Sequence, residues 1–467
     1  MKSAKTFLIL IFSLIFFFPA NAATGGDLDL KTAPEKSRLE AEVDGYIQPF
    51  IEAGGFSGAL LMARGGKMLL AKGFGMANYE LDVPNTPQTR FQIASISKTF
   101  TAAAILLLEE RGKLKLADPL TRFWPGYPNG DKITVHHLLA HTSGIPNVND
   151  FPDYDAKSKF PHTLEDIISW FKDMPLGFAP GEKYAYSNSN YNLLAFIIEK
   201  ASGQKYEEFL KKTIFEPLGM NDTGDGGHPE IILENRASGY SPAGAGGIEN
   251  APVINWSTKR GNGSLFSTVE DLYKWDRALY GEKIIKKDSL EKLFKEHTPG
   301  VGYGWFIGKH LNRRVLYFNG RSPGFTSYLD RFIDDDACII ILSNNYAPVP
   351  HTIISDIAAI LFGEKYNKPE SLKPVPVKSE DLELLAGQYR FGKDFYRPEA
   401  AVSIEKKDGY LTMKWNETFQ SSLMALSPTV FLDRYFWAKI SFEKNARGKV
   451  TRFIWSNSQN YSAEKIR

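Results

Sequence analysis

Hydrophobic and polar positions follow different patterns in the two parts of this chain. Residues 24 to about 365 mix helical and strand periodicities and contain no internal repeat. From position 382 onward, short runs of alternating hydrophobic and polar residues are separated by turns. An Asp-Gly pair at 408–409 and an Arg-Gly pair at 447–448 stand where hairpin turns belong. This spacing predicts a small all-β barrel or sandwich of about 90 residues at the C-terminus.

The segment between these two parts is "EKYNKPESLKPVPVKSED" (364–381), which combines three prolines with charged residues. Proline and charge together favour an extended linker. We therefore predict a first domain over 24–365, a linker over 366–380 and a barrel domain over 381–467.

The N-terminus has a pattern of its own. Lys2 and Lys5 precede an apolar run over residues 7–18, and an Ala-Asn-Ala sequence follows at 20–22. A run of this length is too short to span a bilayer, and with its A-x-A site it is typical of a secretory signal. We expect a signal peptide over 1–22 and a periplasmic or secreted protein; an uncleaved anchor is the alternative.

Composition narrows the function classes. The chain has 56 basic and 54 acidic residues, a net charge of +2, and no basic stripe or zinc-finger spacing, which argues against nucleic acid as a partner. After the signal no apolar run of ~18 residues remains, so no integral membrane segment is expected. Cys338 is the one cysteine and lies in "DDDACIIILSN", where it is expected to be a small hydrophobe in a buried strand.

Candidate chemistry begins at "SISKTFTAAAILLLEERGKL", which predicts a helix from Ser95 to about Arg111 with Gly112 as its stop signal. The helix is apolar on nearly every face over 99–108, so it should be buried. Ser95 and Lys98 share one face, and burial would lower the pKa of Lys98 and favour a role in proton transfer. A capping serine followed by a surface lysine is the alternative, because S-x-x-K alone is common.

A second candidate lies in "GEKYAYSNSNYNLLAFIIEKASG" (181–203), where Tyr186 and Asn188 stand before an amphipathic helix that ends at Gly203. Asn188 is a natural N-cap, so the pair could be purely structural. It could equally deliver a phenol and an amide into a site.

Six segments decide between these alternatives: "RFQIASISKTFTAAAI", "GKLKLADPLTRFWP", "ITVHHLLAHTSGIP", "YAYSNSNYNLLAFIIEKASG", "FEPLGMNDT" and "GNGSLFSTVEDLYKW". In this order they resemble the serine β-lactamase and penicillin-binding-protein superfamily, in its branch of class C β-lactamases, D-Ala-D-Ala carboxypeptidases, D-aminopeptidases and esterases. The resemblance covers about residues 35–365 and implies an α/β (α+β) fold with an antiparallel sheet between helical layers. The C-terminal barrel resembles the lipocalin-like domain of many members.

The resemblance also implies roles. Ser95 would be acylated, and Lys98 would hydrogen-bond its oxygen and keep the local potential positive. Tyr186 would take the serine proton and later activate the deacylating water, and Asn188 would donate to the amide carbonyl of the substrate. Whether Lys98 or Tyr186 is the base stays open. No cofactor is expected, and the substrate would be a small molecule, a peptide or a peptidoglycan-like compound.

The third motif of the family, a strand with Lys-x-Gly or His-x-Gly, is altered here. Alignment on the Gly-Phe pair of "YFNGRSPGFTSYL" places Phe318 where a carboxylate-binding cation would stand. Gly320 still suits a strand that approaches the substrate closely. By resemblance, the N–H groups of Ser95 and Arg321 would form the oxyanion hole. Strand alternation should direct the Arg321 side chain away from the face that carries Phe318.

Phe318 allows two interpretations. Either the site favours substrates without a terminal carboxylate, or the catalytic activity is weakened. We predict an exported serine hydrolase of small esters or amides. The alternatives are a D-Ala-D-Ala carboxypeptidase or β-lactamase, and a catalytically weakened penicillin-binding or sensor-type protein.

Three further segments of the chain match the spacing of known functional motifs. Lys259-Arg260-Gly261 has the spacing of the third motif but precedes a capped helix, so it is not expected to replace it. The sequence at 320–324 matches the G-x-S-x-G of α/β-hydrolases, but the proline after its serine has no N–H for an oxyanion and a strand pattern follows. The histidines at 136, 137 and 141 lack the glutamate of H-E-x-x-H, so no metal is expected.

Overall fold

The structure is a computed structural model that describes residues 33–370, 372–415 and 420–466. Its centre is a six-stranded sheet in the order β10-β11-β12-β13-β1-β2, in which every neighbouring pair is antiparallel. The strands are β1 (Gly58–Arg64), β2 (Lys67–Phe74), β10 (Phe306–His310), β11 (Arg313–Ser322), β12 (Phe325–Phe332) and β13 (Ala337–Ser343). The predicted signal peptide lies outside the described residues.

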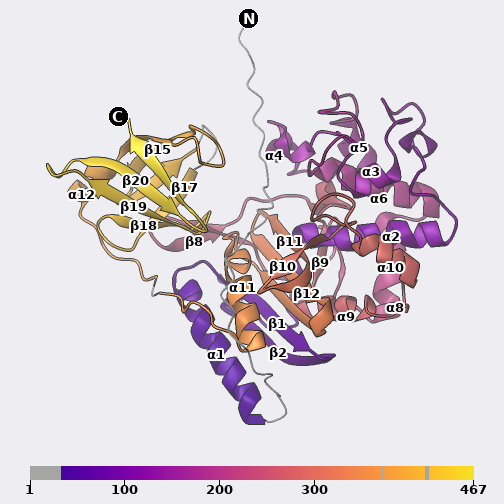
Figure 1. The fold of residues 1–467 in the computed structure, drawn as a ribbon, viewed down its shortest axis with the longest axis horizontal. Helices are drawn as coiled ribbons and strands as arrows, with labels where there is room; N and C mark the ends of the chain where they lie inside the picture. The colour runs from indigo at the N-terminus through magenta and orange to yellow at the C-terminus, as the bar shows by residue number, and fades with distance from the viewer. Residues whose placement is uncertain (1–32, 371, 416–419, 467) are drawn as a thin grey trace, which may run out of the picture.

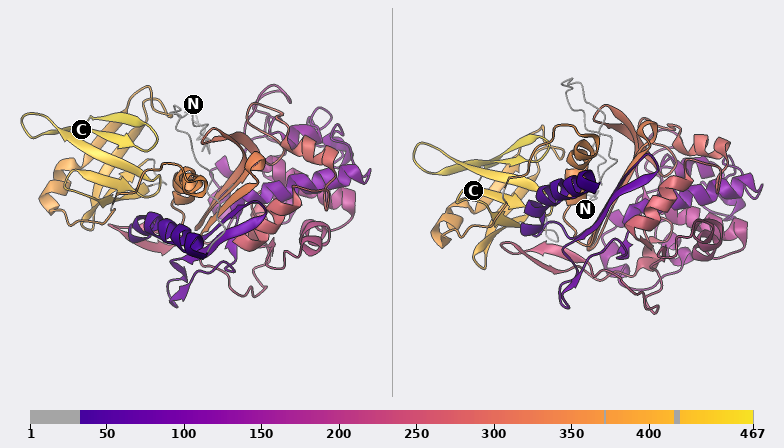
Figure 2. Two further views of the ribbon diagram at one scale, coloured as in Figure 1. Left: turned by 60° about the horizontal axis from the view of Figure 1, so that its bottom comes forward. Right: turned by 90° about the horizontal axis from the view of Figure 1, so that it is seen from below.

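Helices cover both faces of this sheet (Figure 2). Helices α1 (Ala33–Glu52) and α11 (Val349–Phe362) pack on one face, and α2 (Ser97–Glu110), α6 (Asn188–Ser202) and α9 (Val269–Ala278) belong to the core on the other. Successive side chains of a strand alternate between the two faces of a sheet. In β1, Leu60 therefore packs with α1 and α11, and Leu61 packs in the core that contains α2, α6 and α9. The expected antiparallel sheet between helical layers is confirmed.

Shorter elements surround this frame. The remaining helices of the first part are α3 (Val135–Leu139), α4 (Tyr154–Lys157), α5 (Leu164–Ser169), α7 (Tyr206–Leu210), α8 (Glu216–Leu218) and α10 (Lys287–Phe294). The short strands are β3 (Met76–Asn78), β4 (Val83–Pro84), β5 (Phe91–Gln92), β6 (Gly224–Asp225), β7 (Tyr240–Ala243), β8 (Gly247–Asn250) and β9 (Leu265–Ser267). The small sheet β5-β9-β6 matters most, because it joins the chain just before Ser95 to residues 265–267.

The C-terminal part forms a closed eight-stranded barrel (Figure 1). Its strands are β14 (Gly387–Phe391), β15 (Ala401–Lys407), β16 (Tyr410–Lys414), β17 (Gln420–Ala425), β18 (Val430–Asp433), β19 (Ala438–Lys444), β20 (Val450–Ser456) and β21 (Asn460–Lys465), preceded by α12 (Ser379–Leu385). Both expected hairpins are present: Gly409 and Gly448 have φ of 84° and 75°, left-handed values that suit glycine in a tight turn. The barrel prediction is confirmed, whereas the exact domain boundaries stay a prediction.

The barrel shares a hydrophobic core with the first part of the chain. Met424, Leu432 and Trp437 belong to the same buried cluster as α1 and α11. The Trp437 ring lies 5.7 Å from that of Phe50, centroid to centroid. The two parts are therefore packed against each other, and not only joined by the linker.

A buried arginine adds polar contacts to this junction. Arg434 is fully buried and donates to the carbonyl oxygens of Ala243 and Gly247, at 2.6 and 2.8 Å. Burial lowers the pKa of its guanidinium to about 10. Because an unpaired buried charge is costly, these carbonyls fix where the barrel can dock.

Two further observations concern single segments. Cys338 is a buried free thiol in β13, as expected. In the described part of the chain no helix is both long and apolar enough to cross a membrane.

Candidate active site

Ser95 lies on a short 3-10 turn, Ala94–Ile96, immediately before α2. The expected helix is present, but α2 itself begins at Ser97, two residues later than predicted. Ala94 has φ of 45°, a left-handed value that costs a non-glycine residue on the order of 1–3 kcal/mol and is often found at active sites.

The turn is held from both sides by backbone hydrogen bonds. The N–H of Ile93 donates to the carbonyl of Leu265 at 2.9 Å, and the hydroxyl of Ser327 donates to the carbonyl of Ile93 at 2.8 Å. Strands β12 and β9 thus fix the backbone that presents Ser95.

Lys98 is fully buried and points at Ser95. Its Nζ lies 3.0 Å from Ser95 Oγ, 2.9 Å from Asn188 Oδ1 and 2.6 Å from the carbonyl oxygen of Asn262. Burial, and then the positive charge of Lys259, holds the pKa of Lys98 well below its ordinary value. The group is thereby biased toward the neutral amine.

Tyr186 approaches Ser95 from the start of α6, and its hydroxyl donates to Ser95 Oγ at 3.0 Å. Burial raises the pKa of the phenol, so the neutral hydroxyl is favoured. Its ring stacks on that of His141, with 4.6 Å between centroids. Burial, and then Lys98, lowers the pKa of His141, whose Nδ1 accepts the Ser187 N–H at 3.2 Å.

Helix α6 differs in two respects from the sequence expectation. Ser187 occupies the N-cap position and Asn188 is the first helical residue. The helix is also buried around most of its surface from Asn188 to Ile198, and is not simply amphipathic. Gly203, with φ of 72°, ends it as predicted.

A second buried lysine lies in the segment that supplies the Asn262 carbonyl. Lys259 is 7% exposed, and its Nζ donates to the hydroxyl of Tyr154 at 3.2 Å. Among the described residues no carboxylate is within ion-pair distance of it. The sequence gives Lys259 no role in the third motif, but the structure places it close enough to Lys98 for its positive charge to lower the pKa of Lys98.

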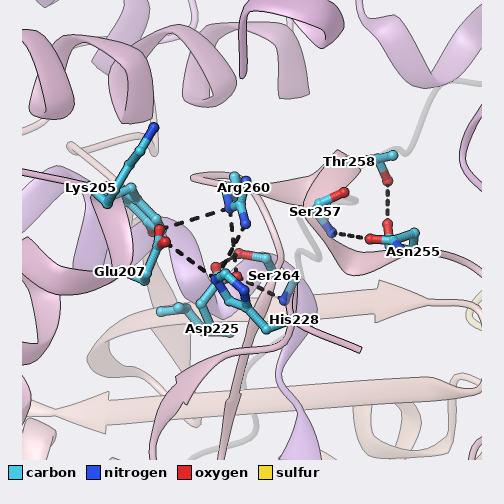
Figure 3. A network of polar contacts seen from close by, with 12 residues as sticks. Lys205, Glu207, Asp225, His228, Asn255, Ser257, Thr258, Arg260 and Ser264 are labelled. Atoms are coloured by element: carbon cyan, nitrogen blue, oxygen red, sulfur yellow. Dashed lines mark hydrogen bonds and ion pairs between the residues drawn. The ribbon is translucent and has the colours of Figure 1, made fainter. Parts of the chain in front are cut away.

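Arg260, the next residue, is engaged in a polar network (Figure 3). Its Nε lies 3.9 Å from a Glu207 carboxylate oxygen and 3.8 Å from one of Asp225. Asp225 is buried and also accepts from the hydroxyl of Ser264. The network anchors the 260–264 segment, and Arg260 is not free to hold a substrate.

Strand β11 passes directly beside the Ser95 turn. A Cβ on Gly320 would lie 2.6 Å from the carbonyl of Ile93 and 2.9 Å from Ala94 Cβ, so only glycine fits. Phe318, on the same face, is 3% exposed and stacks on Phe306 with 4.8 Å between ring centroids. Its ring is therefore part of the core at this position.

Arg321 points away from Phe318 and Gly320, as strand alternation predicts. Its guanidinium packs over the rings of Tyr346 and Tyr435, 4.1 and 4.4 Å from their centroids. It donates to the carbonyl oxygens of the same two residues, at 3.1 and 2.7 Å. Its side chain therefore binds the barrel; only its backbone N–H can serve the site.

The competing patterns have structural roles. Ser322 ends β11 and is followed by strand β12, as expected from the sequence and unlike a nucleophile elbow. His136 bonds the Tyr303 hydroxyl at 2.6 Å, and His137 Nδ1 accepts the N–H of Thr134 in a helix cap. No cluster of three or more metal-binding side chains is found among the described residues.

The structure also brings in residues that sequence reasoning missed. His141 lies in "HLLAHTSG" and Asn262 in "GNGSLFST", two segments that carried the resemblance without an assigned role. Asn147 accepts both the backbone N–H and the side-chain N–H of Asn188, at 2.9 and 3.1 Å. Nothing in the sequence around Asn147, which follows "SGIP", predicts this role.

Comparisons with known proteins show which family the chain resembles. A family model described as "Beta-lactamase" matches residues 43–361. Penicillin-binding protein 4* of Bacillus subtilis (strain 168) is 31% identical over 414 residues, which are 83% of this chain and 90% of that protein.

Solved structures extend the likeness. The D-amino acid amidase of Ochrobactrum anthropi SV3, complexed with L-phenylalanine amide, is 25% identical with a TM-score of 0.64, over 70% of this chain and 99% of that one. The octameric penicillin-binding protein homologue of Pyrococcus abyssi is 27% identical with a TM-score of 0.63, over 92% of this chain and 99% of that one. Because the match to the Pyrococcus abyssi homologue covers 92% of this chain, it includes part of the barrel.

Proposed function

The chain belongs to the beta-lactamase family, and from this premise we propose an exported serine hydrolase that forms an acyl-enzyme on Ser95 and hydrolyses small esters or amides. The observation that carries the proposal is the position of Ser95 Oγ, 3.0 Å from both Lys98 Nζ and the Tyr186 hydroxyl. A serine hydroxyl is a weak nucleophile unless a neighbouring base takes its proton.

Counting the protons supports Lys98 as that base. A neutral amine has two N–H groups, and Asn188 Oδ1 and the Asn262 carbonyl can only accept. Both N–H groups are then committed, and the nitrogen lone pair faces Ser95. Tyr186 donates to Ser95 Oγ, so the serine hydroxyl is left to donate to Lys98.

The reaction follows from this arrangement. Ser95 Oγ attacks the substrate carbonyl while its proton passes to Lys98 Nζ, and the N–H groups of Ser95 and Arg321 receive the oxyanion. The leaving group departs with the proton of the Tyr186 hydroxyl, and the Lys98 ammonium returns a proton to the phenolate. In deacylation, water attacks the acyl-enzyme and gives a proton to the Lys98 and Tyr186 pair, and the same pair returns a proton to Ser95 Oγ as the acyl–oxygen bond breaks.

The chemistry around β11 supports substrates without a terminal carboxylate. Phe318 offers no charge, Arg321 points to the barrel and Arg260 is held by two carboxylates. Placing a carboxylate beside Phe318 would leave a buried charge unpaired, which costs several kcal/mol. The likeness to a D-amino acid amidase makes amides of D-amino acids the amides to try first.

One observation favours a second candidate, a D-Ala-D-Ala carboxypeptidase or a β-lactamase. Lys259 is a buried ammonium group without a carboxylate partner among the described residues. Such a group could receive a substrate carboxylate in place of the missing cation at position 318. The likeness to penicillin-binding proteins points the same way.

A hydrolysis panel separates the two candidates. The compounds are a short-chain nitrophenyl ester, a D-alanyl anilide, a D-Ala-D-Ala peptide and a chromogenic cephalosporin, and Ser95→Ala is the inactive control. We expect kcat/KM to be higher for the ester and the anilide than for the two carboxylate compounds. The opposite order, with a loss in Lys259→Met confined to the carboxylate compounds, would establish the second candidate.

A further inference from the structure

A chain of side-chain hydrogen bonds leads from the Ser95 site to a carboxylate. Asn188, whose Oδ1 contacts Lys98, donates through Nδ2 to Oδ1 of Asn147 at 3.1 Å. Asn147 in turn donates through Nδ2 to Oδ1 of Asp150 at 3.1 Å. Asp150 ends the 3-10 turn Val148–Asp150, in the segment that precedes α4.

The direction of every bond in this chain is fixed at two anchors, the Asp150 carboxylate and the backbone N–H of Asn188, which donates to Asn147 Oδ1 at 2.9 Å. An ionised carboxylate can only accept, so the amide nitrogen of Asn147 must face Asp150. The amide oxygen of Asn147 then faces Asn188, whose own nitrogen must point back at it. The Asn188 oxygen is left facing Lys98, where it binds one of the two N–H groups of the neutral amine.

We propose that Asp150 is a positioning residue, which acts through Asn147 and Asn188 to orient Lys98 toward Ser95. The inference rests on the proposed function only in taking Lys98 as the base. A reversed Asn188 amide would direct N–H groups at Lys98. The amine would then have to turn its lone pair toward Asn188 and away from Ser95.

The surroundings of Asp150 suit this role. It is half-buried, and no basic side chain forms an ion pair with it in the described part of the chain. On the neighbouring α4, Asp155 is exposed, and Lys157 is paired with Asp153 at 2.6 Å. From α6, Asn188 and Ser189 face the turn. Burial raises the pKa of Asp150 to about 7, so its acceptor state depends on pH in the neutral range.

The sign of the pH effect follows. Below pH ~7 Asp150 gains a proton, and the Asn147 amide is then held only by the backbone N–H of Asn188, because a carboxylic acid is a weaker and less directional acceptor. Activity should therefore fall as the pH drops through this range. The fall should be in kcat and not in KM, because Asp150 acts through Asn147 and Asn188 on the base Lys98.

The test compares Asp150→Leu, which has no acceptor, with Asp155→Asn, which removes an exposed carboxylate five residues away. The readouts are kcat and KM on the best compound of the panel, and the rate at which a fluorophosphonate labels Ser95. The labelling rate needs an activated serine but no particular substrate, so it separates failure of this inference from failure of the proposed function. Thermal unfolding checks that each variant is folded.

We expect Asp150→Leu to lose about 10- to 100-fold in kcat and in labelling rate, the range for lost positioning, and to lose the contribution of Asp150 to the fall near pH 7. Asp155→Asn should keep both. In an Asn147→Leu background, which breaks the chain, Asp150→Leu should cause no further loss. A full additional loss in that background, or a folded Asp150→Leu protein whose pH profile is identical to that of the wild type, would overturn the inference.

Discussion

The contact between Trp437 of the barrel and Gly55 beside α1 gives a sharp test of how the two parts of the molecule are joined. A Cβ on Gly55 would lie 2.1 Å from two carbons of the Trp437 ring, whereas an ordinary contact needs 3.4 Å or more. Gly55 has no left-handed φ, so alanine is acceptable to its backbone. The main obstacle to Gly55→Ala is therefore the barrel; the other close atom is Cγ2 of Val349 in α11, at 3.1 Å.

The magnitudes follow from packing. Gly55→Ala forces the indole to move, and overpacking of this kind costs about 1–3 kcal/mol. Trp437 is 9% exposed, and truncating a buried tryptophan to alanine costs about 3–5 kcal/mol. In the double variant the ring is absent and only the milder contact with Val349 remains, so Gly55→Ala should add much less to the cost of Trp437→Ala than it costs alone.

The assay is the free energy of unfolding from urea denaturation, followed by circular dichroism, for wild type, both single variants and the double variant. Gly45→Ala is the matched control, because Gly45 lies within α1 and a Cβ there would meet no atom within 4 Å. This control should be neutral or stabilising by up to about 1 kcal/mol, since glycine is unfavourable inside a helix. If the two single losses simply added in the double variant, the barrel would not pack on Gly55.

Two further predictions concern the bases of the site. Lys98→Ala and Tyr186→Phe should each lose on the order of 100-fold or more in kcat/KM, because both side chains transfer protons, and both proteins should stay folded. A Tyr186→Phe protein with the wild-type rate and melting temperature would exclude the phenol from the reaction. Lys259→Met removes a charge that lowers the pKa of Lys98, so that pKa should rise toward its ordinary value and a higher pH should be needed for full activity. The pH dependence of fluorophosphonate labelling measures this shift, and an unmoved or downward-shifted profile would show that Lys259 does not act on Lys98.

Sequence reasoning succeeded where the determinants are local. The i and i+3 spacing placed Ser95 and Lys98 side by side, and the Asp-Gly and Arg-Gly pairs marked two barrel hairpins. Alternation along β11 predicted that Arg321 would point away from Phe318. These features follow from the geometry of one helix turn, one turn type and one strand.

The features that it missed depend on contacts between distant segments. The carbonyl that binds Lys98 belongs to Asn262, 164 residues along the chain, and Arg321 binds the carbonyl of Tyr435, 114 residues away. Lys259 had the spacing of a motif but not its strand, and only the fold shows it buried near Lys98. No periodicity encodes such pairings, because tertiary packing creates them.

The central claim is that Ser95 is the nucleophile, and covalent labelling tests it most directly. The protein is treated with a fluorophosphonate, digested and analysed by mass spectrometry, with Ser95→Ala as the control. We predict one added phosphonyl group on the peptide that contains Ser95 and no labelling of the variant. Labelling that persists in Ser95→Ala, or that maps to Ser322, would contradict the account.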